Sequence, residues 1–424
     1  MNTGGTPMQR YDELQQELLF EAEQVRNTVN THCHHLPSAA FESISLHKLM
    51  QMTYIGWSNA WFPDTPAERT AYIERNACNT YFQWMARSVG QLYGNGTPLD
   101  ASNWDAIDAA LQFAHAKHGH DLRLLVDVCG YSRIILDKYE RPGHNLWHPE
   151  LFQPTFRCDM FLHGYAADGQ DQNGNSPYDH LDVDATASLE EYIQSVSRAI
   201  ASKKKDGCVA LKLAIAYERD LAFENTDPAK ASLALQAARN EKGLSPTGNG
   251  TSLANQTEIR NYQDYVVYRL AGLAADSGMP FQIHTGLGKL DRSNAICLRR
   301  LIDRNPETRF VLFHCGYPWM DDVLGLLHNY RNVYPDLCWL PLISTSAAIR
   351  FIREAFEVGD ANRLTWGCDT WTSEESHGAL LAIRHSLSSA LASMCREGLV
   401  DLPYAKQLVH GVLYKNAQAL YSWT

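Results

Sequence analysis

Residues 280–286 read PFQIHTG, and residues 309–316 read RFVLFHCG. Each segment is a short apolar run that ends in a histidine, His284 or His314, and a glycine follows two positions later. Such a run bounded by turn residues is typical of a buried strand in a parallel sheet. The histidines are 30 positions apart, and one strand–helix unit takes about 31 residues if a (β/α)8 barrel takes about 250. The two segments therefore predict consecutive strands of such a barrel.

The other predicted strands are short runs rich in apolar and β-branched residues. Working outward, they are 29–34 (VNTHCH), 122–130 (LRLLVDVCG), 156–166 (FRCDMFLHGYA), 208–217 (CVALKLAIAY), 332–339 (NVYPDLCW) and 363–369 (RLTWGCD). Helical stretches separate most of them, and strands that alternate with helices indicate βαβ units. Eight strands of this kind predict an α/β fold, a (β/α)8 TIM barrel.

The chain is longer than a plain barrel, with 424 residues against about 250. Residues 44–118 read as several helices, and residues 8–28 as one more. We therefore expect a single domain, residues 1–424, with an inserted helical subdomain after strand 1 at about 44–118 and extra terminal helices.

Ionisable residues stand where these predicted strands end. His32 and His34 are alternate residues of the first strand, so their side chains share one face. Asp369 ends the last strand, as His284 and His314 end theirs. Barrel enzymes carry their active residues at this C-terminal rim. The five residues are therefore expected to form one site.

Imidazole nitrogens and a carboxylate oxygen suit Zn, Mn or Fe(II), and Zn is the usual choice for hydrolysis. A metal with an open position lowers the pKa of bound water towards ~7. Asp369 could bind the ion and also take the proton from that water. His314 could bind a second ion or polarise a substrate carbonyl. The neighbouring Cys33, Cys315 and Cys368 fall on the opposite face and are expected to be buried packing residues.

Lys212 lies between Ala210 and Ala214 on one face of the predicted strand at 208–217. A lysine inside a barrel is seldom buried without a role. It could be a cation that holds a substrate carboxylate, or a carbamate that bridges two metals. It could also extend its ammonium to the solvated rim. Whether the site takes one ion or two depends on which of these is right.

The order of these residues resembles the amidohydrolase superfamily: HxH after strand one, Lys in strand four, His ending strands five and six, and Asp ending strand eight. The closer match is the amidohydrolase-related group that includes the N-terminal domains of FluG-like proteins. The similar segments span nearly the whole chain. They are VNTHCHHLP, VALKLAIAYERDL, FQIHTGLG, FVLFHCGYPWMDDVLGLLHNYRNVYPDL, LTWGCDTW and LYKNAQALY.

The resemblance implies roles for individual residues. The metal ligands would be His32, His34, His284 and Asp369. His314 would be a ligand or a catalytic residue, and Lys212 a site residue. Arg219 matches a family position that would hold an anionic group of the substrate, and its alternative is an ordinary loop ion pair.

The leading hypothesis for function is a metal-dependent hydrolase that cleaves an amide, ester or lactone bond in a small substrate bearing a carboxylate. The helical insertion also resembles that of uronate isomerases. The alternative is therefore a metal-dependent lyase or isomerase, such as an aromatic acid decarboxylase or a uronate isomerase-like enzyme. A third hypothesis, a non-catalytic barrel used for binding or regulation, is disfavoured by the intact set of ionisable residues.

Composition narrows the class of partner. The net charge of −11 disfavours nucleic acid and anionic membranes, which need a basic surface. No apolar run approaches the ~18 residues of a membrane span, and the N-terminus lacks the apolar core of a signal peptide. The ten cysteines contain no CxxC pair, as expected for reduced thiols. We expect a cytoplasmic enzyme with a small-molecule substrate, no nucleic-acid or membrane partner, and homo-oligomerisation left open.

Overall fold

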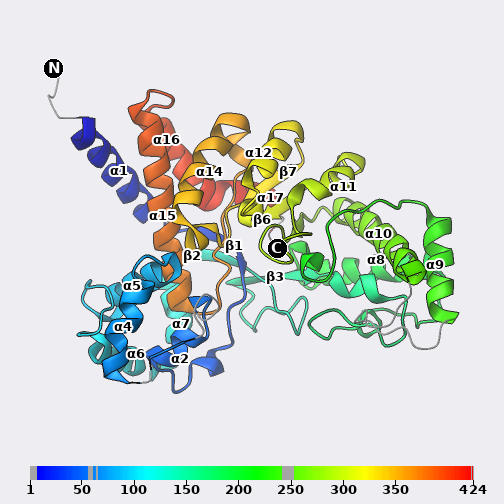
Figure 1. Cartoon of the computed structure of the whole chain (residues 1–424), viewed down its shortest axis with the longest axis horizontal. Coiled ribbons are helices and arrows are strands. Elements are labelled where there is room, and N and C mark those ends of the chain that lie inside the picture. Colours follow the sequence, from blue (N-terminus) through cyan, green and yellow to red (C-terminus); the bar gives the residue numbers. More distant parts are fainter. Residues whose placement is uncertain (1–6, 56–60, 64, 241–252, 422, 424) are drawn as a thin grey trace. The chain divides into compact units, whose positions relative to one another are not determined.

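The structure, a computed structural model, describes residues 7–55, 61–63, 65–240, 253–421 and 423 (Figure 1). The chain divides into two compact units. Unit 1 comprises Met1–Ile134 and Leu337–Ala417, and unit 2 comprises Ile135–Asp336 and Gln418–Thr424. The division does not test the predicted single domain, which stays a prediction.

Regular strands follow one another along the chain, with helices between most of them. They are β1 Thr28–Cys33, β2 Tyr131–Leu136, β3 Phe152–Arg157, β4 Ala210–Leu213, β5 Phe281–Ile283, β6 Phe310–Phe313 and β7 Val333–Asp336. Their order in the sheet is the order in the chain. Every residue of β3, β4, β5 and β6 is buried, as is usual for parallel strands. The fold is an α/β barrel, as predicted.

In unit 2, β3 to β7 are parallel, and each pairs with its neighbour in sequence. Lys212 of β4 is in register with Gln282 of β5, and Gln282 is in register with Val311 of β6. His284 and His314 follow β5 and β6 directly, so the register brings them to the same edge of the sheet. The helices of this unit are α8 Leu189–Lys205, α9 Pro228–Asn240, α10 Leu253–Asp276, α11 Arg299–Arg304 and α12 Met320–Asn329.

Unit 1 is largely helical. Its helices are α1 Pro7–Gln24, α2 Leu46–Gln51, α4 Pro66–Asn76, α5 Thr80–Tyr93, α6 Trp104–His115, α7 His120–Arg123, α13 Leu340–Ile343, α14 Thr345–Val358, α15 Ser373–Arg396 and α16 Leu402–His410. The short α17, Asn416–Leu420, crosses the boundary between the units. The predicted N-terminal helix is confirmed as α1, which packs on α15, and Gln15 donates a hydrogen bond to Ser389 Oγ at 2.8 Å.

The helices predicted between residues 44 and 118 are present as α2, α4, α5 and α6. They share an apolar cluster that includes Leu49, Tyr72, Phe82 and Ile107, all buried. A capping box between Thr65 and Glu68 begins α4, which fits the turn signal in the sequence. Whether these helices form a separate subdomain stays a prediction.

The strand predicted at 122–130 is wrong. These residues form α7 and a π-helical turn, Leu124–Val128, and the strand β2 comes directly afterwards. Leu124 and Leu125 are buried, whereas Val126 and Val128 are 47% and 44% exposed, so the apolar run has one buried face instead of two. The strand predicted at 156–166 is also displaced, because β3 ends at Arg157 and a 3-10 helix, Asp159–His163, follows.

The predicted eighth strand is an extended segment with one regular bridge, at Thr365. Leu337 N donates to Thr365 O at 2.9 Å on one side. On the other side the segment follows β1, with Thr31 N donating to Trp366 O at 3.2 Å. The chain therefore occupies the position expected of the last strand without its regular ladder.

Cys33, Cys315 and Cys368 are fully buried, which confirms that they are packing residues.

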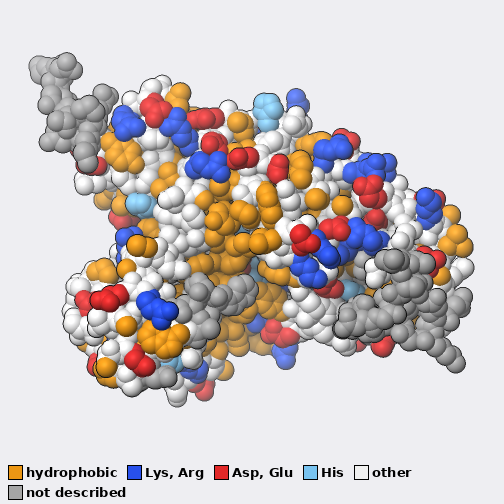
Figure 2. Space-filling model, viewed as in Figure 1, with side chains coloured by type: hydrophobic (Ala, Val, Ile, Leu, Met, Phe, Trp, Pro, Cys, Tyr) orange, Lys and Arg blue, Asp and Glu red, His pale blue; other side chains and the backbone are white. Residues whose placement is uncertain are grey.

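On the face drawn in Figure 2, acidic and basic side chains are interspersed. Among the residues described, no helix combines the length and the apolar character needed to cross a membrane.

Candidate functional site

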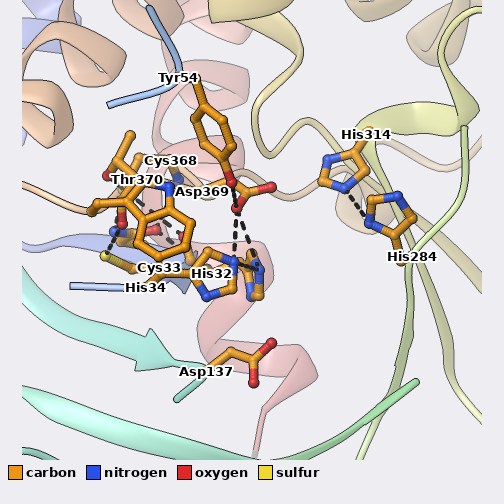
Figure 3. Close-up of polar contacts among 12 residues, drawn as sticks. His32, Cys33, His34, Tyr54, Asp137, His284, His314, Cys368, Asp369 and Thr370 are labelled. Carbon is orange, nitrogen blue, oxygen red and sulfur yellow. Dashed lines mark hydrogen bonds and ion pairs between the residues drawn. The ribbon is translucent and has the colours of Figure 1, made fainter. Parts of the chain in front are cut away.

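The first strand places two histidines on one side, as strand alternation predicts. His32 and His34 lie at the end of β1, and their Nε2 atoms are 3.2 Å apart (Figure 3). Cys33 turns the opposite way, where its thiol donates to the carbonyl of Thr370 at 3.2 Å. Burial raises the pKa of the Cys33 thiol well above its usual value, so this thiol stays neutral.

Asp369 meets the two histidines within unit 1. Its backbone N donates to the carbonyl of His32 at 2.9 Å, and His34 N donates to Thr370 O at the same distance. These bonds align the extended segment with β1. They bring Asp369 Oδ1 to 3.6 Å from His32 Nε2 and 3.1 Å from His34 Nε2 (Figure 3).

The three donor atoms have the spacing of a small cation's ligands. Bonds of about 2.0–2.2 Å around a tetrahedral ion place ligand atoms about 3.3–3.6 Å apart. The observed separations are 3.2, 3.6 and 3.1 Å. The side chains of His32, His34 and Asp369 are at most 5% exposed. Two imidazoles and one carboxylate therefore form a donor set that fits Zn, Mn or Fe(II).

Two predicted site residues have strained backbones. Asp369 has φ of 55° and His314 has φ of 60°, a region that residues other than glycine seldom adopt. Each costs on the order of 1–2 kcal/mol. Such conformations gather at functional sites, where the surroundings hold them in place.

Three further residues surround Asp369 and His34. Tyr54 donates through its hydroxyl to Asp369 Oδ1 at 3.1 Å, and the ring of Trp371 lies 5.2 Å from that of His34. Glu375 accepts hydrogen bonds from the backbone N atoms of Tyr54, at 3.1 Å, and Trp371, at 2.9 Å. Burial raises the pKa of Glu375 to about 8, although both hydrogen bonds act to lower it.

Sequence reasoning missed these three residues. The sequence did offer a signal for Trp371, which stands two positions after Asp369 in LTWGCDTW. No sequence signal pointed to Tyr54, because it belongs to the helical insertion. Its contact with Asp369 depends on how that insertion packs. Glu375 looks like an ordinary first-turn acid of α15, and only its burial distinguishes it.

In unit 2, His314 and His284 meet at the ends of β6 and β5. His314 Nε2 lies 3.0 Å from His284 Nδ1 (Figure 3). His284 Nε2 contacts the carbonyl of Leu287, so this nitrogen carries the proton and Nδ1 is the acceptor. A histidine that donates one ring N–H to a backbone carbonyl and presents the other nitrogen is a common form of metal ligand. The ring of Tyr217 lies 4.5 Å from that of His284.

Lys212 and Arg219, also in unit 2, differ in their surroundings. Lys212 is 2% exposed, and its ammonium lies 3.6 Å from the centroid of the Phe313 ring, so it does not extend to solvent. Arg219 donates to Asp264 at 2.7 Å and to Gln263 at 3.1 Å. The geometry of Arg219 favours the ion-pair alternative, and its role in substrate binding stays a prediction.

The family whose model matches this chain is described as Amidohydrolase, and the match covers residues 212–423. Protein fluG of Emericella nidulans is 25% identical over 361 residues. That alignment covers 80% of this chain and 40% of protein fluG. The chain thus spans less than half the length of this curated relative.

Solved structures share the fold at low sequence identity. A uronate isomerase from Thermotoga maritima has a TM-score of 0.72 at 15% identity, with 97% of each chain covered. A protein from Lactobacillus casei assigned as a metal-dependent hydrolase has a TM-score of 0.66 at 18% identity, over 95% of this chain and 96% of its own. A glucuronate isomerase from Caulobacter crescentus has a TM-score of 0.70 at 16% identity, over 97% and 94%.

Proposed function

The chain belongs to the amidohydrolase family, and on that premise we propose that it is a metal-dependent hydrolase. Its substrate would be a small molecule with an amide, ester or lactone bond and a carboxylate. The observation that carries the proposal is the convergence of His32, His34 and Asp369 within unit 1. Two imidazoles and a carboxylate are a donor set typical of hydrolytic metal sites.

The proposed ligands are His32, His34 and Asp369, with His284 as a further ligand because of its place in the family's order. Zn is the expected ion, and Mn or Fe(II) the alternatives. When bound, such an ion lowers the pKa of water towards ~7 and so supplies a nucleophile near neutral pH. A second ion would need Lys212 as a bridging carbamate.

Each side chain would then have its own role in hydrolysis. Asp369 takes a proton from the attacking water, whose oxygen bonds to the acyl carbon. The acyl–N or acyl–O bond breaks, and the leaving group receives that proton. Tyr54 keeps Asp369 oriented through Oδ1. His314 polarises the substrate carbonyl or binds the ion. Lys212 or Arg219 binds the substrate carboxylate.

Arg219 is the other candidate for that carboxylate. Arg219 already donates to a carboxylate, that of Asp264. The ammonium of Lys212 lies 3.6 Å from the centroid of the Phe313 ring.

Asp369→Asn tests this mechanism. The amide keeps the shape of the side chain but cannot take a proton, so turnover should fall by about 100-fold or more. Steady-state hydrolysis of a panel of acyl amides, esters and lactones provides the measurement. Asp291→Asn is the matched control, since the Asp291 side chain is 74% exposed. Turnover by Asp369→Asn at the wild-type rate would refute the role of Asp369.

The alternative is metal-dependent isomerisation or decarboxylation, in which no water is consumed. Two of the structures that share the fold bear the names uronate isomerase and glucuronate isomerase. Hydrolysis differs from isomerisation and decarboxylation in that an oxygen atom of the product comes from water. We expect one atom of 18O from labelled water in the acid product. Unlabelled product from a uronate or an aromatic acid would favour the alternative.

A further inference from the structure

A second group of metal-ligating side chains lies in unit 1. His115 ends α6, His120 begins α7, and Glu374 lies in the first turn of α15. His115 Nε2 is 2.7 Å from Glu374 Oε1, and the two imidazole rings are 4.8 Å apart, edge to face. One ligand atom from each of the three residues lies within 4.8 Å of the others. None of them belongs to the site proposed for hydrolysis.

A tyrosine completes this group. The hydroxyl of Tyr93 donates to Glu374 Oε1 at 2.6 Å and lies 3.1 Å from His120 Nε2. The side chains of His115 and Glu374 are 3% and 0% exposed. Two imidazoles and one carboxylate are the set that holds zinc or non-haem iron, with coordination positions left open for water.

A cavity gives access to the two histidines. It has a volume of about 250 Å³, and its lining includes Ser38, His115, His118, His120 and Asp121. A hydrated ion and its exchangeable waters fit into a space of this size, since one water takes about 30 Å³ of liquid volume. Glu374 is fully buried.

We propose that His115, His120 and Glu374 form a second divalent metal site, which binds zinc. His115 Nε2 and Glu374 Oε1 are now at hydrogen-bond distance, and their separation must widen by about half an ångström to reach the edge of a tetrahedral site. His115 ends α6 and His120 begins α7, so this adjustment is local. Bound zinc would fasten α6 and α7 to the first turn of α15.

The position of the site suggests what the ion does. Glu375, the next residue along α15, holds the backbone of Tyr54 and Trp371. Zinc on Glu374 would therefore stabilise the same helical turn that positions the residues around Asp369. The proposed role is structural, and it does not depend on the reaction that the other site performs.

Zinc binding to the full-length protein tests the proposal. The protein is stripped with a chelator, reloaded with Zn²⁺ and desalted, and the bound zinc is counted by elemental analysis. In a His32→Ala/His34→Ala background, we expect about one equivalent, one ion per site. Adding His120→Ala should reduce it below about 0.1 equivalent. His118→Ala, in the same cavity but outside the ligand group, should keep the full equivalent.

Two outcomes would overturn the proposal. One is the absence of zinc from the folded His32→Ala/His34→Ala protein, and the other is unchanged binding after His120→Ala. If the double variant does not fold, His120→Ala is made in the wild-type chain and should remove one equivalent while the remaining metal stays. Circular dichroism checks the fold of each variant. Failure of the hydrolase proposal would show in turnover and in the label experiment, whereas this proposal is decided by the zinc count.

Discussion

Asp369 reaches the histidines because the chain two residues earlier passes very close to β1. A Cβ atom at Gly367 would lie 2.5 Å from His32 N and 2.8 Å from Thr31 Oγ1. The neighbour at 2.5 Å is backbone, which cannot rotate away as a flexible side chain could. Glycine is therefore required at 367 for the hydrogen bonds that align Asp369 with β1.

Gly367→Ala should separate the two segments and displace Asp369. We expect a loss of about 1–3 kcal/mol in the free energy of unfolding and a fall in kcat/KM of about 100-fold, since a shift of about 1 Å has that effect. Urea unfolding and steady-state kinetics provide the measurements. Gly325→Ala is the control, because nothing lies within 4 Å of a Cβ there. Equal unfolding free energies and equal kcat/KM values for the two variants would contradict the requirement for glycine at 367.

At the scale of elements, the first turns of α15 connect three parts of unit 1. Glu374 accepts from Tyr93, and Glu375 accepts from the backbone of Tyr54 and Trp371. His377, further along the helix, lies 3.0 Å from Ser88 Oγ of α5. The Ser88 hydroxyl donates to Glu374 O at 2.6 Å, so His377 donates to Ser88 through Nδ1. Burial of this helix thus brings several ionisable groups out of water.

His377 should make unit 1 sensitive to acid. Burial, assisted by the charge of Arg384 and opposed by that of Glu374, lowers its pKa to about 4, against about 6.5 in the unfolded chain. The neutral form is therefore favoured by folding. Its contribution is complete above about pH 6.5 and is lost as the pH falls towards 4, by on the order of 3 kcal/mol.

The difference in unfolding free energy between wild type and His377→Gln, measured in urea from pH 7 to pH 4, checks this expectation. The difference should shrink as the pH falls, because only the wild type takes up the extra proton on unfolding. His148→Gln is the comparison variant, since the side chain of His148 is 40% exposed. A constant difference for His377→Gln would disprove the expectation.

At the scale of the whole molecule, metal removal should lower thermal stability. An ion that binds only the folded chain stabilises it by about 2.7 kcal/mol at a hundredfold excess over Kd. In a chain of this length, that is a shift of a few degrees in Tm. The His120→Ala protein isolates the centre proposed for hydrolysis.

In that variant, a chelator should lower Tm and added zinc should restore it, as followed by calorimetry. The same protein with His32→Ala and His34→Ala should show no shift. A Tm that is indifferent to chelator and zinc in a metal-free preparation of His120→Ala would argue against the proposed ligands.

The alternation of strands and helices could be predicted from sequence, because burial on both faces leaves a local pattern of short apolar runs. The pairing of His32 with His34 could be predicted for the same reason, since two residues on one strand share a face by geometry alone. The strand at 122–130 could not be placed correctly. A helix with one buried face and a buried strand have similar apolar content over nine residues, and only packing distinguishes them.

By itself, the sequence determined the family, the fold class and the places of His284 and His314 directly after β5 and β6, because these depend on short segments and on their order. The tertiary structure alone decided what surrounds them. Tyr54 reaches Asp369 from 315 positions away, and His115 reaches Glu374 from 259. Both contacts depend on how the helices pack, and the pattern of apolar residues around them does not indicate that packing. The sequence could thus predict that His32, His34 and Asp369 lie together, whereas it could not predict which residues hold and orient them.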